Sequence, residues 1–294
     1  MVSLSKEYIK NYLSLIKFSH TIFAMPFALV GYFLAIKKDH GEYDWKLLIM
    51  VILCMVLARN ASMAFNRFID RDFDEKNPRT AVREIPAGTI KPFSALKFVI
   101  LNSILFVTVT FFINKLVFFL SPVALFVTLG YSLTKRFTSL SHFVLGLGLS
   151  LAPIGAYLSV TGHFSVLPLF FSGIVLLWVS GFDILYALQD IDFDKKAELK
   201  SFPVWLGKKG AMFTSKILHA ITALLVIMVG IKGSFHLLFI IGSVIFISLL
   251  IFQHLIISPR NLKRLNLAFF TTNGVASLLF AILAILDMYF PLHF

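Results

Sequence analysis

The chain has 294 residues, of which 58% are hydrophobic and only 14% are charged, whereas an average soluble domain carries about 25% charged residues. Its net charge is +12, but Lys and Arg lie mostly between apolar blocks, a pattern that favours contact with lipid headgroups and argues against nucleic acid as a partner. The composition therefore indicates an integral membrane protein and excludes an ordinary soluble domain.

Nine apolar blocks bounded by charged residues, Gly or Pro predict membrane-spanning helices, which need about 20 residues each. They cover residues 15–36, 47–69, 93–113, 116–134, 140–161, 165–189, 211–231, 234–257 and 267–290. With nine spans, most of the 27 Lys and Arg residues fall on the side of the N-terminus. The positive-inside rule then places the N-terminus and the loops after even-numbered spans in the cytoplasm. We expect the membrane to be a cell inner membrane.

The first span carries two polar side chains near its start. Lys17 could neutralise a bound carboxylate or simply anchor the helix end. His20 could orient an acceptor molecule or pack between helices. Both interpretations stay open for both residues.

An acidic cluster occupies residues 66–75, at the predicted cytoplasmic end of the second span. Residues four apart share a helix face, so Asn66, Asp70 and Asp74 form one oxygen-bearing stripe on a continuous helix. Carboxylates so placed repel each other unless a cation is present, and oxygen donors without His or Cys suit Mg²⁺. Asp72 falls on the opposite face, where a solvated or ion-paired role is as reasonable as a metal role.

Basic residues that could bind phosphate lie on the same predicted side of the membrane. Arg79 and Arg83 follow the first acidic cluster, and Lys135 and Arg136 follow the fourth span. The planar fork of an Arg side chain suits phosphate oxygens. These side chains are candidates for stabilising a diphosphate leaving group.

The fifth span contains features that we interpret as packing. Gly146 and Gly148 predict a close approach of neighbouring helices rather than a nucleotide-binding loop. Five histidines in and around the later spans show no spacing typical of metal ligands, namely His142, His163, His219, His236 and His254.

A second acidic cluster ends the sixth span and repeats the spacing of the first. Tyr186, Asp190 and Asp194 form another stripe, and Asp183 lies further into the span. Intramembrane carboxylates are functional by default, although a buried structural role for Asp183 is equally reasonable. Asp192, on the opposite face, has the same two interpretations as its counterpart in the first cluster.

Two similarly spaced clusters on one side of the membrane predict a shared site. Two facing acidic stripes would hold metal ions that clamp one diphosphate, while a lipid-like tail lies among Phe, Leu and Ile between the helices.

Three segments resemble signatures of the UbiA superfamily of membrane prenyltransferases. The first runs from Asn66 through Asp74 and on to Asn77-Pro-Arg79, and the second from Tyr186 through Asp194 to Lys200-Ser-Phe-Pro. The third is Tyr131-Ser-Leu-Thr-Lys135-Arg136-Phe. The similarity runs along essentially the whole chain, with one departure, since Arg67 stands where many members carry Asp.

The resemblance implies an all-α integral membrane fold, with nine transmembrane helices around a central lipid-open cavity in one prenyltransferase domain covering residues 1–294. It implies that Asp70, Asp74, Asp190 and Asp194 are catalytic and, with Asn66, bind Mg²⁺ that bridges to a polyprenyl diphosphate. The residues expected to bind substrate are Asn66, Arg79, Arg83, Lys135, Arg136, Tyr131, Tyr186, Lys17 and His20.

The activity implied is transfer of the prenyl group to the ring of a small aromatic acid, in ubiquinone or menaquinone biosynthesis. Flanking residues resemble enzymes acting on 4-hydroxybenzoate, or on a 1,4-dihydroxy-6-naphthoate type of acceptor. The alternative is a secondary membrane transporter with an acidic ion site. It is disfavoured because the carboxylates gather at one mouth rather than near the membrane midplane.

Overall fold

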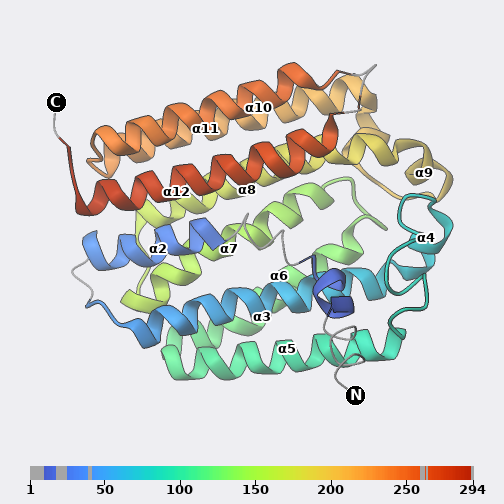
Figure 1. Cartoon of the computed structure of the whole chain (residues 1–294), viewed down its shortest axis with the longest axis horizontal. Coiled ribbons are helices and arrows are strands. Elements are labelled where there is room, and N and C mark those ends of the chain that lie inside the picture. The colour runs from blue at the N-terminus through green and yellow to red at the C-terminus, as the bar shows by residue number, and fades with distance from the viewer. Residues whose placement is uncertain (1–9, 18–24, 39–41, 259–261, 263, 293–294) are drawn as a thin grey trace.

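A computed structural model describes residues 10–17, 25–38, 42–258, 262 and 264–292. The regular secondary structure of these residues is helical, and the long helices run roughly along the long axis of the molecule (Figure 1). The long helices are α2 (Met25–Lys38), α3 (Trp45–Ile69), α5 (Pro92–Ile113), α6 (Lys115–Thr134), α7 (Ser141–Thr161), α8 (Val166–Tyr186), α10 (Phe202–Lys232), α11 (Leu237–Ile256) and α12 (Asn273–Tyr289). The short elements are α4 (Arg71–Lys76), η2 (Ala187–Asp190), α9 (Ile191–Lys196) and the π-helical turn η3 (Leu267–Thr272).

Seven helices in the described part of the chain are long and apolar enough to cross a membrane. Two shorter apolar helices, α2 and α12, lie within the first and ninth predicted blocks. The prediction of an all-helical, multi-pass membrane protein is confirmed. The full count of nine spans and a central lipid-open cavity stay predictions.

The first predicted span is wrong at its start. Residues 16 and 17 form a turn, Lys17 has a φ of 45°, and α2 begins only at Met25. Pro26 stands in the first turn of α2, where a missing backbone N–H leaves no helical bond unmade. His20 lies outside the described residues.

The largest hydrophobic core joins α2, α7 and α8 to the three C-terminal long helices. Trp178 is fully buried, and its ring packs against Phe27, Phe182 and Phe246 with centroids 5.1–5.6 Å apart. Its indole N–H donates to the Oδ1 of Asn273, 3.0 Å away, which satisfies the one polar group that burial would leave unpaired. This core fixes α8, which carries the second acidic cluster, against α12.

Helices α7 and α8 approach closely at Gly146. A Cβ atom at this position would lie 2.4 Å from the backbone oxygen of Leu176 and 2.4 Å from the hydroxyl of Ser180. The predicted close packing at Gly146 is therefore confirmed, and the start of α7 is held against the end of α8.

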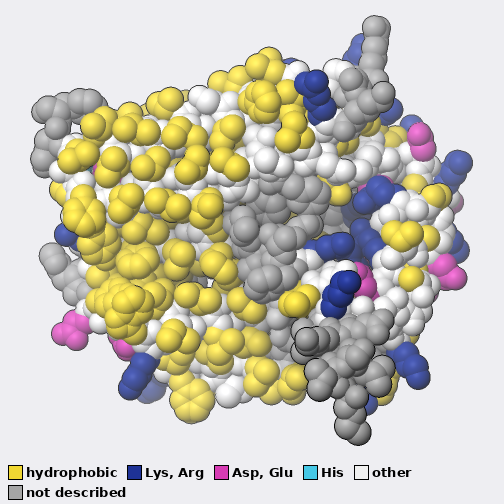
Figure 2. All heavy atoms as spheres, in the orientation of Figure 1, with side chains coloured by type: hydrophobic (Ala, Val, Ile, Leu, Met, Phe, Trp, Pro, Cys, Tyr) yellow, Lys and Arg dark blue, Asp and Glu magenta, His cyan; other side chains and the backbone are white. Residues whose placement is uncertain are grey.

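Both acidic clusters lie at one end of the bundle, where α3 and α8 finish. Figure 1 shows α4 and α9 together at this end, which we call the motif end. Figure 2 shows hydrophobic side chains over much of the visible face and Lys, Arg, Asp and Glu gathered toward the motif end. The chain therefore separates a charged end from an apolar belt.

The Gly146 contact predicts a large effect of one methyl group. We expect Gly146→Ala to lower the unfolding free energy by about 1–3 kcal/mol, because the added atom overlaps backbone of α8. Gly130→Ala is the matched control, since a Cβ atom added at this position on α6 would have no heavy atom within 4 Å. Thermal unfolding in detergent measures both, and equal melting temperatures for the two variants would contradict the packing.

Candidate functional site

Both acidic motifs turn a corner at the first aspartate of each pair. Helix α3 ends at Ile69, and Asp70 has φ −89° and ψ 4° before α4 begins. Asp190 has φ −100° and ψ 1° before α9 begins. Each predicted stripe therefore bends at its aspartate instead of following one continuous helix. Neither Asp70 nor Asp190 caps the following helix with its side chain, and the carboxylates are bound instead by side chains from other segments, Arg136 and Arg79.

The turn keeps the predicted neighbours in contact. Asn66 donates from its amide to the Oδ2 of Asp70, 2.9 Å away. Asp74 and Asp194, each on the short helix after its corner, are buried, with 6% and 2% of their surfaces exposed.

Asp72 and Asp192 point to solvent instead. The Asp72 side chain is 72% exposed and lies 3.5 Å from Arg71, and Asp192 is also exposed. These observations favour the solvated interpretation of both residues.

Each of the four predicted catalytic carboxylates pairs with one of the four predicted phosphate-binding cations. The closest N–O distances are 3.7 Å for Asp70–Arg136, 2.6 Å for Asp74–Arg83, 2.7 Å for Asp190–Arg79 and 3.9 Å for Asp194–Lys135. The Arg79 contact is bidentate, with a second bond of 2.9 Å from Nε to Oδ1 of Asp190.

These pairs join the two motifs. Arg79 follows the first motif but binds Asp190 in the second. Lys135 and Arg136, adjacent in the loop between α6 and α7, divide between Asp194 and Asp70. The two acidic clusters thus lie together in the fold, and their joint role in binding a diphosphate stays a prediction.

Further hydrogen bonds hold the same loops together. The guanidinium of Arg136 donates to the backbone oxygen of Ile69 at 2.8 Å, and the N–H of Lys200 donates to the backbone oxygen of Lys135 at 2.7 Å. Arg79 also lies over the ring of Tyr186, 5.8 Å from its centroid. These contacts bring Tyr186 and the loop after the second motif to the site.

The pKa values of Asp70, Arg79, Lys135 and Asp194 are all raised at this site. Burial, followed by the charge of Asp74, raises the pKa of Asp70 to about 6, against the opposing effect of nearby cations. Burial lowers the pKa of Lys135, but the surrounding carboxylates, Asp194 foremost, outweigh it and raise the pKa overall.

The donor set suits a hard divalent cation. The carboxylates and the amide oxygen of Asn66 are oxygen ligands of the kind that Mg²⁺ takes. Oδ2 of Asp194 is buried without a hydrogen-bond partner among the described residues. The same residues contain no group of three or more His, Cys, Asp or Glu side chains gathered to hold an ion. In this arrangement the carboxylate oxygens face basic side chains.

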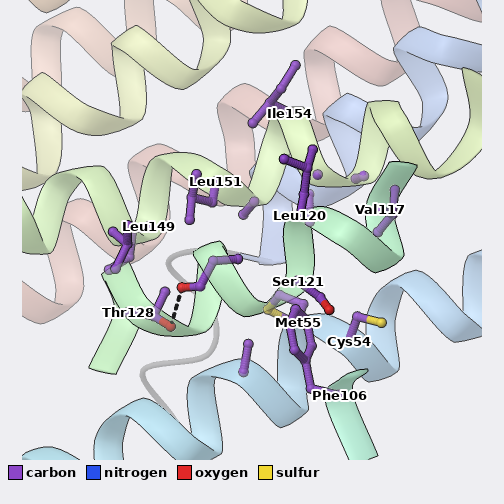
Figure 3. A pocket seen from close by; sticks show the side chains of 18 of the residues that line it. Cys54, Met55, Phe106, Val117, Leu120, Ser121, Thr128, Leu149, Leu151 and Ile154 are labelled. Carbon is purple, nitrogen blue, oxygen red and sulfur yellow. Dashed lines mark hydrogen bonds between the residues drawn. The ribbon is translucent and has the colours of Figure 1, made fainter. Parts of the chain in front are cut away.

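An apolar cavity of about 320 Å³ lies between α3, α5, α6 and α7. Figure 3 shows side chains from these helices around it, and the labelled ones include Met55, Phe106, Leu120 and Leu149. A few polar residues join the apolar lining, among them Arg59, Ser62, Thr128 and Tyr131. The mainly apolar lining of the cavity suits a hydrocarbon, and several polar groups lie on its wall.

Tyr131 connects the cavity to the charged site. It lines the cavity and lies within electrostatic range of Asp70 and Asp183. Lys17, in contrast, makes no hydrogen bond or ion pair with the four paired aspartates in the described part of the chain.

Two features of the site were missed from the sequence. Nδ1 of His142 lies 2.6 Å from Oδ2 of Asp183, although the His residues showed no ligand spacing. The partners are on different helices, so spacing along the chain carries no signal for this pair. Arg59 could have been found, because an Arg within an apolar span is itself a functional indication.

Comparison with known proteins gives one consistent family. A model of the UbiA prenyltransferase family matches residues 24–275. The 4-hydroxybenzoate octaprenyltransferase of Aliivibrio fischeri (strain MJ11) is 29% identical over 240 residues, 82% of this chain and 83% of that protein.

Solved structures agree with this result. An apo UbiA homologue from Aeropyrum pernix K1 has 30% identity and a TM-score of 0.83, over 92% of this chain and 98% of that chain. A UbiA homologue from Archaeoglobus fulgidus, bound to DMAPP and Mg²⁺, has 22% identity and a TM-score of 0.75, over 95% and 99% of the two chains. The second likeness shows the fold.

The raised pKa of Asp70 predicts a stability change. The Asp70 carboxyl binds its proton more tightly in the folded chain, where its pKa is about 6, than in the unfolded chain, where it is near 3.8. Protonated Asp70 therefore stabilises the fold below about pH 4, and this contribution to the unfolding free energy is lost as pH rises through about 6. Without divalent cations, Asp70→Asn should raise the unfolding free energy at pH 7 by about 1–2 kcal/mol.

Thermal unfolding between pH 4 and 7 in a chelator checks this expectation. Asp192→Asn, an exposed carboxylate on α9, is the control and should follow the parent curve. Melting temperatures of Asp70→Asn, followed by Tyr or Trp fluorescence, that depend on pH as those of the parent do would show that Asp70 is not the titrating group.

Proposed function

Since the chain belongs to the UbiA prenyltransferase family and is a membrane prenyltransferase, we propose that it transfers a polyprenyl group from its diphosphate to the ring of a small aromatic acid. One observation carries this proposal: four aspartates from two distant segments interlock with four cations beside a mainly apolar cavity. That arrangement offers a place for a charged head and a place for a hydrocarbon tail.

The motif end would bind the diphosphate. Asn66, Asp70, Asp74, Asp190 and Asp194 would hold Mg²⁺. The A. fulgidus homologue of the same fold was solved bound to DMAPP and Mg²⁺. Bound at the motif end, the metal neutralises negative charge on the diphosphate and on the carboxylates around it.

The four cations would then exchange partners. Arg79, Arg83, Lys135 and Arg136 now pair with carboxylates, and a metal on those carboxylates frees them to bind phosphate oxygens. As the allylic C–O bond breaks, both electrons pass to the diphosphate, whose growing charge these side chains stabilise.

The tail would occupy the cavity between α3, α5, α6 and α7. Its wall is mostly Leu, Val, Ala, Ile and Phe side chains, which bury hydrocarbon at about 25 cal/mol per Å². The proposal covers polyprenyl groups of any length whose first isoprene units fit this cavity.

The acceptor would lie where the cavity meets the motif end. Arg59 would bind the carboxylate of the aromatic acid, with Ser62 and Tyr131 near the ring. The relative from A. fischeri is a 4-hydroxybenzoate octaprenyltransferase, and a 1,4-dihydroxy-6-naphthoate type of acceptor presents the same carboxylate. The product would enter ubiquinone synthesis in the first case and menaquinone synthesis in the second.

The protein would lie in a cell inner membrane with its N-terminus and the motif end toward the cytoplasm. The concentration of Lys and Arg in the loops of that side supports this orientation. Family membership removes the ground for the transporter alternative, because the paired aspartates are accounted for by diphosphate chemistry.

The direct test supplies purified protein in lipid nanodiscs with octaprenyl diphosphate, Mg²⁺ and each acceptor in turn. Mass spectrometry should detect a C-prenylated ring with one of them and free diphosphate in equal amount. No prenylated product with either acceptor would overturn the proposed substrate class.

The buried carboxylates should be indispensable to this reaction. We expect Asp194→Asn to lower kcat at least about 100-fold, because the site loses a charge that balances the metal. Asp192→Asn, two residues away but exposed, should keep kcat. Chelation of divalent cations should stop the parent enzyme, and added Mg²⁺ should restore it.

Arg59 should affect the acceptor alone. Hydrogen bonds to a charged group contribute about 1.5–3 kcal/mol, so Arg59→Gln should raise KM for the aromatic acid about 10- to 100-fold. KM for octaprenyl diphosphate should stay constant, and Arg59→Lys should recover part of the loss. Equal KM changes for both substrates would place Arg59 elsewhere in the mechanism.

A further inference from the structure

Asp183 and His142 form a partly buried acid–histidine pair near the four pairs of the motif end. Asp183 lies in the last turn of α8 and His142 in the first turn of α7, with 2.6 Å between Oδ2 and Nδ1. The close approach of the two helices at Gly146 and a hydrogen bond of 3.2 Å from the Ser180 hydroxyl to the backbone oxygen of His142 hold both partners in place.

The hydrogen bond defines the arrangement of the pair. The His142 side chain is 1% exposed, and its Nε2 has no hydrogen-bond partner among the described residues. A protonated Nε2 would bury an unsatisfied charged donor, whereas a bare nitrogen is only an unused acceptor. The ring proton is therefore placed on Nδ1, from which His142 donates a hydrogen bond to the Asp183 carboxylate.

Asp183 is only partly buried and lies near both the charged site and a residue of the cavity wall. Its side chain is 22% exposed, and His142 uses only one of its two oxygens. It lies within electrostatic range of Lys135, which pairs with Asp194, and of Tyr131, which lines the apolar cavity. One turn along α7 from His142, Leu145 is already part of the cavity wall. Asp183 thus lies at the junction of the diphosphate site and the cavity.

The carboxylates of Asp70, Asp74, Asp190 and Asp194 have other roles under the proposed function. Each pairs with a cation and would hold metal under the proposed function, so none is free to receive a proton. Asp183 pairs instead with His142, which binds one carboxylate oxygen and orients the side chain.

We propose that Asp183 is the base that removes the ring proton, and that His142 positions it. The inference rests on the proposed function. A bond forms between the allylic carbon of the prenyl group and a ring carbon as the C–O bond to diphosphate breaks. The C–H bond at that ring carbon then breaks, its electrons restore the aromatic ring, and the proton goes to the free oxygen of Asp183.

The test uses full-length protein in nanodiscs, octaprenyl diphosphate, Mg²⁺ and whichever acceptor the parent enzyme prenylates. Asp183→Asn should lower kcat about 100-fold or more, the range expected for loss of a general base. The acceptor deuterated at the prenylated ring carbon should show a larger isotope effect on kcat in this variant than in the parent. KM for octaprenyl diphosphate and the Mg²⁺-dependent thermal shift with inorganic diphosphate should be retained, because the metal site is intact.

The His142 variants separate positioning from structure. His142→Asn keeps an N–H near the position of Nδ1 and should retain most of kcat, whereas His142→Leu should lose it and gain the isotope effect. If Asp183→Asn does not fold, this pair decides the question. Asp192→Asn is the control in every measurement.

The outcomes distinguish the two proposals. Absence of prenyl transfer by the parent enzyme overturns the proposed function and this inference with it. Transfer by the parent, together with a kcat of Asp183→Asn within about tenfold of it and an unchanged isotope effect, overturns the inference alone. Loss of the diphosphate thermal shift in Asp183→Asn would also overturn it, by making Asp183 part of the metal site.

Discussion

The structure at the motif end depends on the need to compensate negative charge at the edge of an apolar bundle. Buried ions without partners cost several kcal/mol each, so carboxylates placed there require cations close by. Four aspartates meet this need with four Lys or Arg side chains taken from loops far apart in the chain. Because the partners cross between motifs, charge compensation also fixes how the loops lie relative to one another.

The same pairs suit a site that exchanges partners. A buried ion pair contributes little net stability once the cost of desolvation is counted, so it can be opened when another charge takes the place of one member. Metal on the carboxylates and diphosphate on the cations would be such a replacement. The raised pKa of Asp70 follows first from its burial and second from the charge of Asp74.

Helix packing places a second kind of chemistry beside these pairs. The Gly146 contact allows α7 and α8 to lie close enough for His142 to reach Asp183, and the aromatic core around Trp178 holds α8 from its other side. The apolar cavity begins one turn away along α7. Charged site, acid–histidine pair and hydrocarbon cavity thus follow one another along the bundle.

The membrane class, the approximate bounds of most helices and the two acidic motifs follow from the amino-acid sequence alone, because apolar periods and charge boundaries are local properties of the chain. The four cations could also be named in this way, although not which aspartate each one binds. The corners at Asp70 and Asp190 were not foreseen, because i to i+4 spacing fits a continuous helix as well as one that bends at the aspartate. That Arg79 reaches Asp190 and that His142 meets Asp183 is settled in the folded molecule, since these partners lie 111 and 41 residues apart and are joined solely by the packing of separate helices.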